Sequence, residues 1–395
     1  RGSTQTLAYL VREAGTVSAT VLIGFGMNGP EYNGSFQKGL SFNAIALVLA
    51  CLVTLQIPIS LYLIEEPKPL KLGVETEGGK VRKAEEGGKA DGKGQGGETA
   101  SAPDTCMRAC SSLFNTLQSG ATFEYIVYLF LSSAVGGIST TAGSEITRQW
   151  AVVENLQYQL FKLAGSLLFV LGLWITRTYF LNTSWRMLIL STTVIMSIID
   201  APFTFLTVFG VVRNQYFFLD EVLLVAIPRA TGFIVSIFVI VELAGEGSEG
   251  LTYGFLTTVG NLGGPVSTSL SNALFGLFRP SLSDAQNYID DTPEFRWTVA
   301  NSYLLGYIFT VFAMCLLPLL PDQKDDTQHR LRTRPRSRWF AWITLWTVGL
   351  ALTSSLILNI LTIVPSTSCL QIAGGVGCTP ETELMKSTAP AGKHS

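Results

Sequence analysis

Nine long apolar blocks, separated by short polar segments, are the feature that most constrains how this chain can fold. A helix needs about 20 mostly apolar residues to cross a bilayer. Of the 395 residues, 48% are hydrophobic and only 14% are charged, against about 25% charged in a typical soluble protein. The pattern predicts an all-α polytopic membrane protein. The predicted spans are residues 7–27, 42–64, 122–142, 156–178, 186–212, 221–243, 251–278, 298–320 and 339–364.

Two basic segments set the predicted orientation. Residues 65–108 are rich in Gly, Lys and Glu and cannot bury enough apolar surface to offset the entropy of ordering, so a disordered linker is expected. The segment 321–338 contains five arginines between Arg330 and Arg338. Cytoplasmic loops carry an excess of Lys and Arg, so both segments are predicted to be cytoplasmic. Counting spans places the tail, 365–395, on the outside.

The chain offers little for enzyme chemistry. Its two histidines, His329 and His394, lie in the basic segment and the tail, so we expect no His-based triad and no metal cluster. No phosphate-binding loop of the Walker type is present. The net charge of −2 gives no indication of nucleic-acid binding. We therefore expect a protein that is not an enzyme and needs no cofactor.

Asp200 and Arg229 are charged residues near the middle of two apolar blocks. A charge at that depth costs on the order of 3 kcal/mol, so such residues usually face a bundle interior or a water-filled cavity. The Arg229 guanidinium could hold a substrate carboxylate bidentately; the structural alternative is an ion pair with Asp200 or Glu221. For Asp200, pairing or proton-coupled gating is favoured over substrate contact. Pro202 predicts a kink nearby.

Two further polar residues in the apolar blocks, Lys162 and Asn261, each allow two interpretations. Lys162 either meets an anion, with Tyr158 one helical turn away stacking on a flat ring, or extends its ammonium to the membrane interface. Asn261 would bond either a substrate edge or a neighbouring helix. Gly260, Gly263 and Gly264, close to Asn261, indicate tight helix packing or a bend before Pro265.

The tail and one loop contain candidate modification sites. Cys369 and Cys378 lie in the predicted exoplasmic tail, where oxidation is permitted, so they form either a disulfide or two free thiols. Asn33 begins an Asn-Gly-Ser sequon in a predicted outside loop and is a candidate glycosylation site.

The sequence after Arg229, ATGFIVSIFVIVELAGEGSEGLTYGFLTTVGNLGGPVSTSLSNALFGLF, resembles the folate–biopterin transporter family of the major facilitator superfamily, particularly its oomycete-type members. The opening RGSTQTLAYLVREAG and the later SLSDAQNYIDDTPEF and LPLLPDQK are similar to the same family. That family has two six-helix halves joined by a cytoplasmic loop. The resemblance implies a major facilitator-type bundle with a partial first half, lacking its first four helices, and a complete second half.

The resemblance also divides the chain into regions. Residues 1–64 would be the last two helices of the first half, 65–108 the linker and 109–320 the second half. Residues 321–338 would then be a basic cytoplasmic loop, 339–364 an additional helix and 365–395 the tail. The segments ending in Tyr9 and Tyr253 are similar to each other, as expected if the fifth and eleventh helices are equivalent in the two halves.

The implied function is secondary active transport of folate- or biopterin-type pteridines by alternating access, coupled to protons, in the plasma membrane or an internal membrane. Transport of a nucleoside-like metabolite, or a receptor or remnant that does not transport, are the alternatives. Arg229 would lie on the tenth helix, which lines the central cavity, and Asp200 on the peripheral ninth helix. For Glu242, Glu246 and Glu249, the resemblance implies a cytoplasmic gating loop; the alternative is a solvated acidic turn.

Overall fold

The protein is helical throughout the part of the chain described by the structure, a computed structural model. No β-strand occurs among these residues, and one isolated β-bridge joins Ser119 to Arg336. The described residues are 2–32, 36–63, 102–244 and 249–364, with residues 366, 367, 369, 370, 372, 374, 375 and 378 of the tail.

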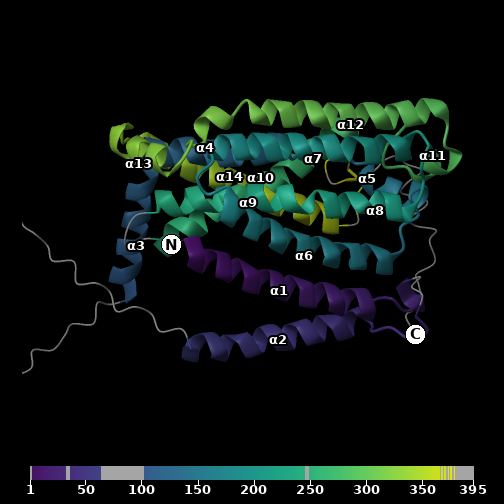
Figure 1. Ribbon diagram of the computed structural model, residues 1–395, viewed down its shortest axis with the longest axis horizontal. Coiled ribbons are helices and arrows are strands. Elements are labelled where there is room, and N and C mark those ends of the chain that lie inside the picture. Colours follow the sequence, from purple (N-terminus) through teal and green to yellow (C-terminus); the bar gives the residue numbers. More distant parts are fainter. Residues whose placement is uncertain are drawn as a thin grey trace, which may run out of the picture.

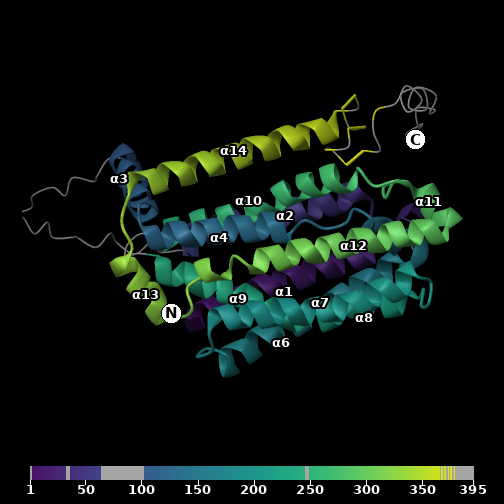
Figure 2. The ribbon, with the colours of Figure 1, turned by 90° about the horizontal axis from the view of Figure 1, so that it is seen from above.

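Every predicted apolar block is helical, and the long helices lie side by side in a bundle, with consecutive helices running in opposite directions (Figures 1 and 2). Their connections therefore alternate between the two ends of the bundle. The long helices are α1 (Gly2–Gly26), α2 (Phe42–Leu63), α4 (Gly120–Gly136), α6 (Asn155–Tyr179), α7 (Trp185–Val208), α8 (Gln215–Leu224) followed by α9 (Ala226–Leu243), α10 (Glu249–Phe275), α12 (Pro293–Met314) and α14 (Arg338–Ile363).

Six spans in the described part of the chain are long and apolar enough to cross a membrane: α2, α6, α7, α8 with α9, α12 with the turn after it, and α14. The protein is therefore a multi-pass integral membrane protein. The other three predicted spans are also helical. Helix α4 is shorter, and α1 and α10 carry polar side chains such as Arg12 and Asn261, which lower their mean hydropathy.

Two of the apolar blocks differ in detail from the pattern: one helix ends early, and one block is broken into two helices. The block 122–142 stops at Gly136, where a second glycine, Gly137, follows. The block 221–243 becomes two helices that meet at Val225, three residues before Pro228, because proline has no amide hydrogen to continue the backbone ladder. The break lies four residues before Arg229, one of the two charged residues near the middle of apolar blocks.

A helix that the apolar pattern did not predict, α3 (Ala102–Leu117), lies across one end of the bundle (Figure 1). It begins inside the range assigned to the linker, of which residues 65–101 lie outside the described residues. Leu117 is buried, and the Phe114 ring contacts the Trp342 ring of α14 at 5.7 Å. These contacts anchor the C-terminal part of α3 to the bundle.

Glycines allow two pairs of helices to approach closely. A Cβ atom at Gly263 of α10 would lie 2.4 Å from the Ser133 side chain of α4, and one at Gly172 of α6 would lie 2.8 Å from Ala230 of α9. The packing role predicted for Gly263 is therefore confirmed. It is wrong for Gly264, because nothing lies within 4 Å of a Cβ at that position. These contacts fix α4 against α10 and α6 against α9 around the site.

The two ends of the bundle carry different short elements (Figure 1). The inner end, as we define it, carries α3 and α13 (Lys324–Thr333), so both predicted basic segments contribute to the same end. There the Arg330 guanidinium pairs with Glu124 of α4 at 3.1 Å and with Asp326 at 3.0 Å. The outer end carries η1 (Pro30–Tyr32), α5 (Gly143–Glu145), the π-helical turn Ile146–Trp150 and α11 (Ala285–Asp290); the short turn η3 (Leu317–Leu319) follows α12.

Candidate functional site

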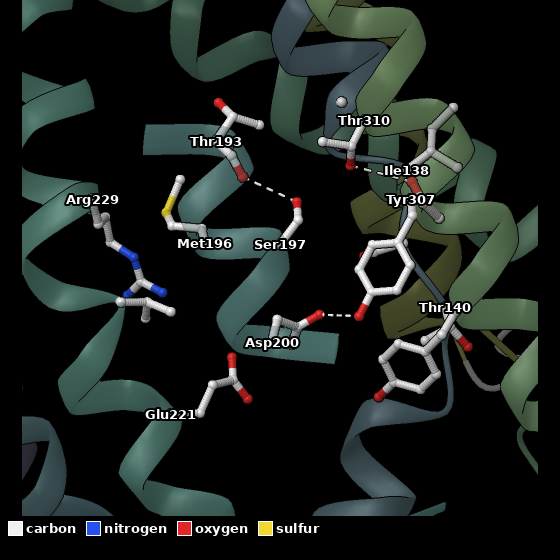
Figure 3. Close-up of a pocket in the computed structure, with 15 residues that line it drawn as sticks. Ile138, Thr140, Thr193, Met196, Ser197, Asp200, Glu221, Arg229, Tyr307 and Thr310 are labelled. Atoms are coloured by element: carbon white, nitrogen blue, oxygen red, sulfur yellow. Dashed lines mark hydrogen bonds between the residues drawn. The ribbon is translucent and has the colours of Figure 1, made fainter. Parts of the chain in front are cut away.

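A cavity of about 340 Å³ lies among α7, α8, α9 and α12, with the segment after α4 completing its wall. We call it the central cavity. Figure 3 shows Arg229 on one side, Tyr307 on the opposite side, and the carboxyl groups of Asp200 and Glu221 between them. Its charged and hydroxyl-bearing lining residues are Ser139, Thr140, Thr193, Ser197, Asp200, Glu221, Arg229, Tyr303, Tyr307 and Thr310.

Asp200 faces the central cavity because α7 brings one polar face to it. Thr193 and Ser197 precede Asp200 at helical spacing and line the same cavity. The Asp200 carboxylate accepts a hydrogen bond of 2.5 Å from the Tyr307 hydroxyl of α12 and one of 3.3 Å from the Thr204 hydroxyl. A charge in the middle of an apolar span is thus held by hydroxyl donors from its own helix and from α12.

Glu221 brings a second carboxyl group to the same place. It lies on α8, is half-buried, and interacts with the Asp200 carboxyl group and with the Arg229 guanidinium. Two carboxyl groups that share a poorly hydrated site repel each other when both are ionised. The carboxyl groups of Asp200 and Glu221 thus face the same space in the central cavity, across from Arg229.

Arg229 lies in the first turns of α9, just after the break at Val225. Among the residues that the structure describes, no ion pair within 4.0 Å involves this guanidinium. Arg229 also lines a second, smaller cavity of about 170 Å³ between α1, α6 and α9, which we call the side cavity. Lys162 of α6 and Glu13 of α1 line the side cavity as well. One guanidinium therefore borders two charged cavities.

The structure brings together some of the candidates from the sequence and not others. Arg229, Asp200 and Lys162 lie around these two adjoining cavities. Tyr158 is 42% exposed and lines neither cavity. Asn261 is exposed on α10 and also lies outside both. Stacking by Tyr158 beside Lys162 therefore has no geometric support in this arrangement.

Sequence reasoning missed two tyrosines of this site and undervalued one glutamate. Tyr303 and Tyr307 lie four residues apart on α12 and line the central cavity, a spacing that places both on one helix face. That spacing was visible in the sequence of block 298–320. The sequence indicated Glu221 only as a possible partner of Arg229, because Glu221 lies at the start of its apolar block.

Of the proposed gating glutamates, Glu242 and Glu249 lie at the inner end. Glu242 at the end of α9 pairs with Lys324 of α13 at 3.6 Å, and its side chain also accepts a hydrogen bond from Gln328. Glu246 lies outside the described residues, and only the backbone of Glu249, the first residue of α10, is described. The contact of Glu242 with α13 ties the inner end of α9 to the basic segment.

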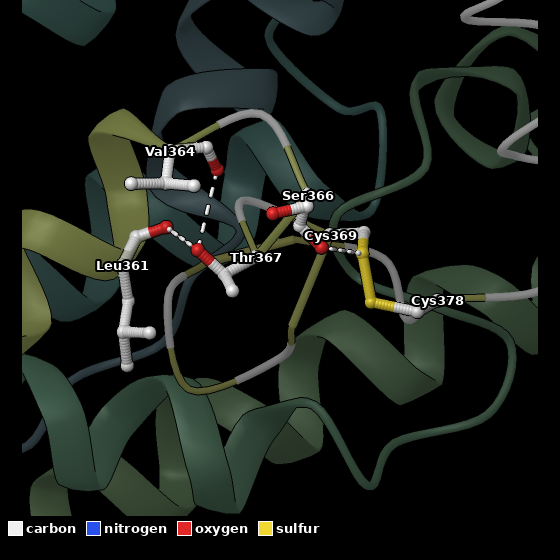
Figure 4. The surroundings of a disulfide bond; sticks show 6 residues. All are labelled: Leu361, Val364, Ser366, Thr367, Cys369 and Cys378. Carbon is white, nitrogen blue, oxygen red and sulfur yellow. Dashed lines mark hydrogen bonds between the residues drawn. A yellow bond between two sulfur atoms is a disulfide. The ribbon is translucent and has the colours of Figure 1, made fainter.

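The cysteine pair lies at the outer end of α14. Cys369 and Cys378 form a disulfide with a Cα–Cα distance of 5.0 Å (Figure 4). The hydroxyl of Thr367 donates to the carbonyl oxygens of Leu361 and Val364 and so ties the start of the tail to the helix end. The sequon residue Asn33 lies outside the described residues.

An ion cluster fixes the loops at the outer end. The Asp291 carboxylate, directly after α11, pairs with Arg213 at 2.7 Å and with Arg296 at 2.6 Å. The Arg213 guanidinium also lies over the Trp150 ring, 4.5 Å from its centroid. Partial burial alone would raise the pKa of Asp291, but the hydrogen bonds from Arg213 and Arg296 outweigh it and lower the pKa to about 2. The cluster holds the α7–α8 connection against α12.

No group of three or more His, Cys, Asp or Glu side chains in the described residues could hold a metal ion. Charged and hydroxyl-bearing side chains that line cavities inside a membrane-spanning bundle are typical of membrane transporters.

Comparison with known proteins gives the family. The model of the BT1 family, the folate–biopterin transporters, matches residues 2–337, and the chain belongs to that family. Members of this family are transporters rather than enzymes. Searches of curated proteins and of solved structures found no significant match.

Proposed function

We propose that this protein is a proton-coupled transporter of pteridines of the folate or biopterin class. The observation that carries this proposal is the central cavity. One guanidinium, two interacting carboxyl groups and two tyrosines face one space inside a membrane-spanning bundle. Charged side chains at that depth cost free energy, so they usually line a transport pathway or pair with another residue.

The chemistry of the cavity fits a flat, polar ring with an anionic tail. The Tyr303 and Tyr307 rings offer faces for stacking, and their hydroxyls can donate or accept hydrogen bonds. Carboxylates accept hydrogen bonds from the amino and ring N–H groups of a pteridine. The Arg229 guanidinium suits a carboxylate, which folate has and biopterin lacks. Lys162 in the adjoining side cavity offers a second positive charge for the same tail.

The Asp200–Glu221 pair is the proposed coupling site. Protonation of the pair on one side of the membrane and release on the other would alternate the charge beside Arg229. With the pair fully ionised, Arg229 is attracted to the protein's own carboxylates. With a proton bound, that attraction weakens and Arg229 favours a substrate anion. Proton binding and anion binding would then be linked thermodynamically.

Alternating access is the proposed mechanism, with two halves moving about the cavity. In this proposal residues 1–64 belong to the first half and 109–320 to the second, joined by the linker 65–108. The segment 321–338 connects to the additional helix 339–364, and 365–395 is an exoplasmic tail. Glu242 would act at the inner end, where its contact with Lys324 must adapt as α9 moves.

Uptake into proteoliposomes tests the proposal. Vesicles containing the full chain should accumulate labelled biopterin and folate above empty vesicles, and an imposed pH gradient should change the initial rate. Accumulation of a nucleoside in preference to both pteridines would replace the substrate class. Saturable binding without accumulation would favour a receptor, and the absence of both binding and accumulation would contradict the proposed function.

A further inference from the structure

Four aromatic side chains from four helices meet on the inner side of the charged cavities. The Tyr9 ring of α1 contacts the Phe233 ring of α9 edge-on at 5.0 Å. The Phe233 ring also contacts Phe169 of α6 at 5.8 Å. The Tyr9 hydroxyl is hydrogen-bonded to the Tyr253 hydroxyl of α10. We call this set, Tyr9, Phe169, Phe233 and Tyr253, the aromatic layer.

The aromatic layer lies next to the side cavity, on the side toward the inner end of the bundle. Helix α1 runs from the inner end outward, so Tyr9 lies one turn, about 5.4 Å, inward of Glu13. Helix α9 runs inward, so Phe233 lies about one turn inward of Arg229. Phe169 itself lines the side cavity. On each of these helices the charged or cavity-lining residue is outward and the aromatic ring is inward.

The layer is partly shielded from solvent: Tyr9 is buried, and Phe169, Phe233 and Tyr253 are half-buried. Tyr9 is 8% exposed, although the next residues on the same helix include exposed Arg12. The Arg12 guanidinium lies 5.9 Å from the centroid of Tyr9 and 5.7 Å from that of Phe233, an arrangement that adds cation–π attraction. Aromatic rings in contact across the path of a polar solute form an apolar constriction, and such constrictions close a pathway by excluding water.

The positions of Tyr9 and Tyr253 in the sequence indicate that their contact lies where the two halves of the protein meet. Tyr9 and Tyr253 each end a Leu-x-Tyr segment in the two similar stretches of the chain. Equivalent residues of two repeats can touch only near the axis that relates the repeats. A contact at that axis breaks when the halves separate at the inner end and re-forms when they close.

We propose that Tyr9, Phe169, Phe233 and Tyr253 are the inner seal of the transport pathway, closed in this structure and opened when α1 separates from α9 and α10. The proposal rests on the proposed transport function. It assigns to these four residues a role in gating, and to the Tyr9–Tyr253 hydrogen bond the role of a reversible latch between the halves.

Cysteine accessibility tests the seal without requiring transport. Ser166 lines the side cavity one turn outward of Phe169. Ser166→Cys would be introduced into a chain in which Cys51, Cys106, Cys110 and Cys315 are replaced by alanine. In inside-out vesicles, a membrane-impermeant thiol reagent then reports how often the seal opens. Labelling should be slow with the native layer and about tenfold faster with Tyr9→Ala or Tyr253→Ala, because each change shifts the population toward the open seal.

Matched variants make the result decisive. Tyr62→Ala removes an exposed tyrosine near the inner end of α2, outside the layer, and should leave the labelling rate unchanged. Tyr9→Phe and Tyr253→Phe keep the ring packing but remove the hydroxyl contact; labelling should rise about threefold. These variants carry the test if the alanine variants do not fold. Unchanged labelling in the folded layer variants, or an equal increase in Tyr62→Ala, would overturn the seal.

The labelling assay and the uptake assay can fail independently of each other. A protein that accumulates pteridines but shows no effect of the layer variants on labelling would contradict the seal alone. A protein that accumulates nothing yet labels faster after Tyr9→Ala would keep the seal and contradict the transport proposal.

Discussion

Asp200 is hydrogen-bonded to Tyr307 at 2.5 Å, a contact that joins α7 to α12 across the central cavity. An ion pair with Asp200 or Glu221 was the structural alternative for Arg229. The structure instead directs the Asp200 carboxylate toward two hydroxyls and toward the carboxyl group of Glu221. Arg229 has no ion pair within 4.0 Å among the described residues and lines both cavities, and in the proposed function it binds the substrate anion.

Arg229→Lys should distinguish the two pteridines. Lysine keeps the positive charge but loses the two-pronged geometry for a carboxylate. We expect folate uptake to fall about tenfold and biopterin uptake to change by less than about twofold, because biopterin has no carboxylate. Initial uptake rates at matched protein abundance measure both. Equal losses for the two substrates would indicate gating, and unchanged uptake of both in Arg229→Ala would remove Arg229 from the site.

Glu221→Gln should uncouple transport from protons. Glutamine keeps the size and hydrogen bonding of the side chain but cannot ionise, so the pair with Asp200 loses one exchangeable proton. Uptake driven by a pH gradient should fall at least about tenfold, while exchange of labelled for unlabelled substrate persists. Asp220→Asn, one residue earlier and exposed, is the control and should retain gradient-driven uptake. Gradient-driven uptake that survives in Glu221→Gln would exclude the pair as the coupling site.

Asp291 should make the outer end sensitive to acid. Because its folded-state pKa is lowered to about 2, it contributes stability that is fully present above the unfolded-state value, about 3.9. That stability is lost as pH falls toward about 2. Asp291→Asn should lower the free energy of unfolding by about 2 kcal/mol at pH 7. At pH 2 the variant and the native protein should differ little in this free energy. Asparagine tolerates the left-handed backbone at this position, where φ is 48°. A thermal unfolding series across this pH range would contradict the assignment if the difference stayed constant.

Labelling of the tail cysteines should report both the disulfide and the orientation. Cys369 and Cys378 should resist alkylation by an impermeant reagent in intact cells until a reductant is added. A tag inserted near Gly375 should then be cleaved by external protease, and a tag near Gly92 should be protected. Rapid labelling without reductant would contradict the disulfide, and the opposite protease pattern would reverse the predicted orientation.

The amino-acid sequence determined the class of this protein because the requirement for apolar length is local. Each block of about 20 apolar residues is helical, whatever it packs against, because a bilayer leaves no other partner for its backbone. The unusual charges, Asp200 and Arg229, were visible for the same reason. Their cost depends on depth in the apolar block and not on any neighbour.

Only the tertiary structure decided which charges share a space. Glu221 lies near the start of its block and looked peripheral, but the packing of α8 against α7 brings it into the same cavity as Asp200. Tyr158 looked like a partner of Lys162, but it is 42% exposed and lines neither cavity. The hydroxyls of Tyr9 and Tyr253 meet although 244 positions separate them in the chain. Contacts between helices depend on close approach at glycines such as Gly172 and Gly263, and on rotation about each helix axis, which local hydropathy does not specify.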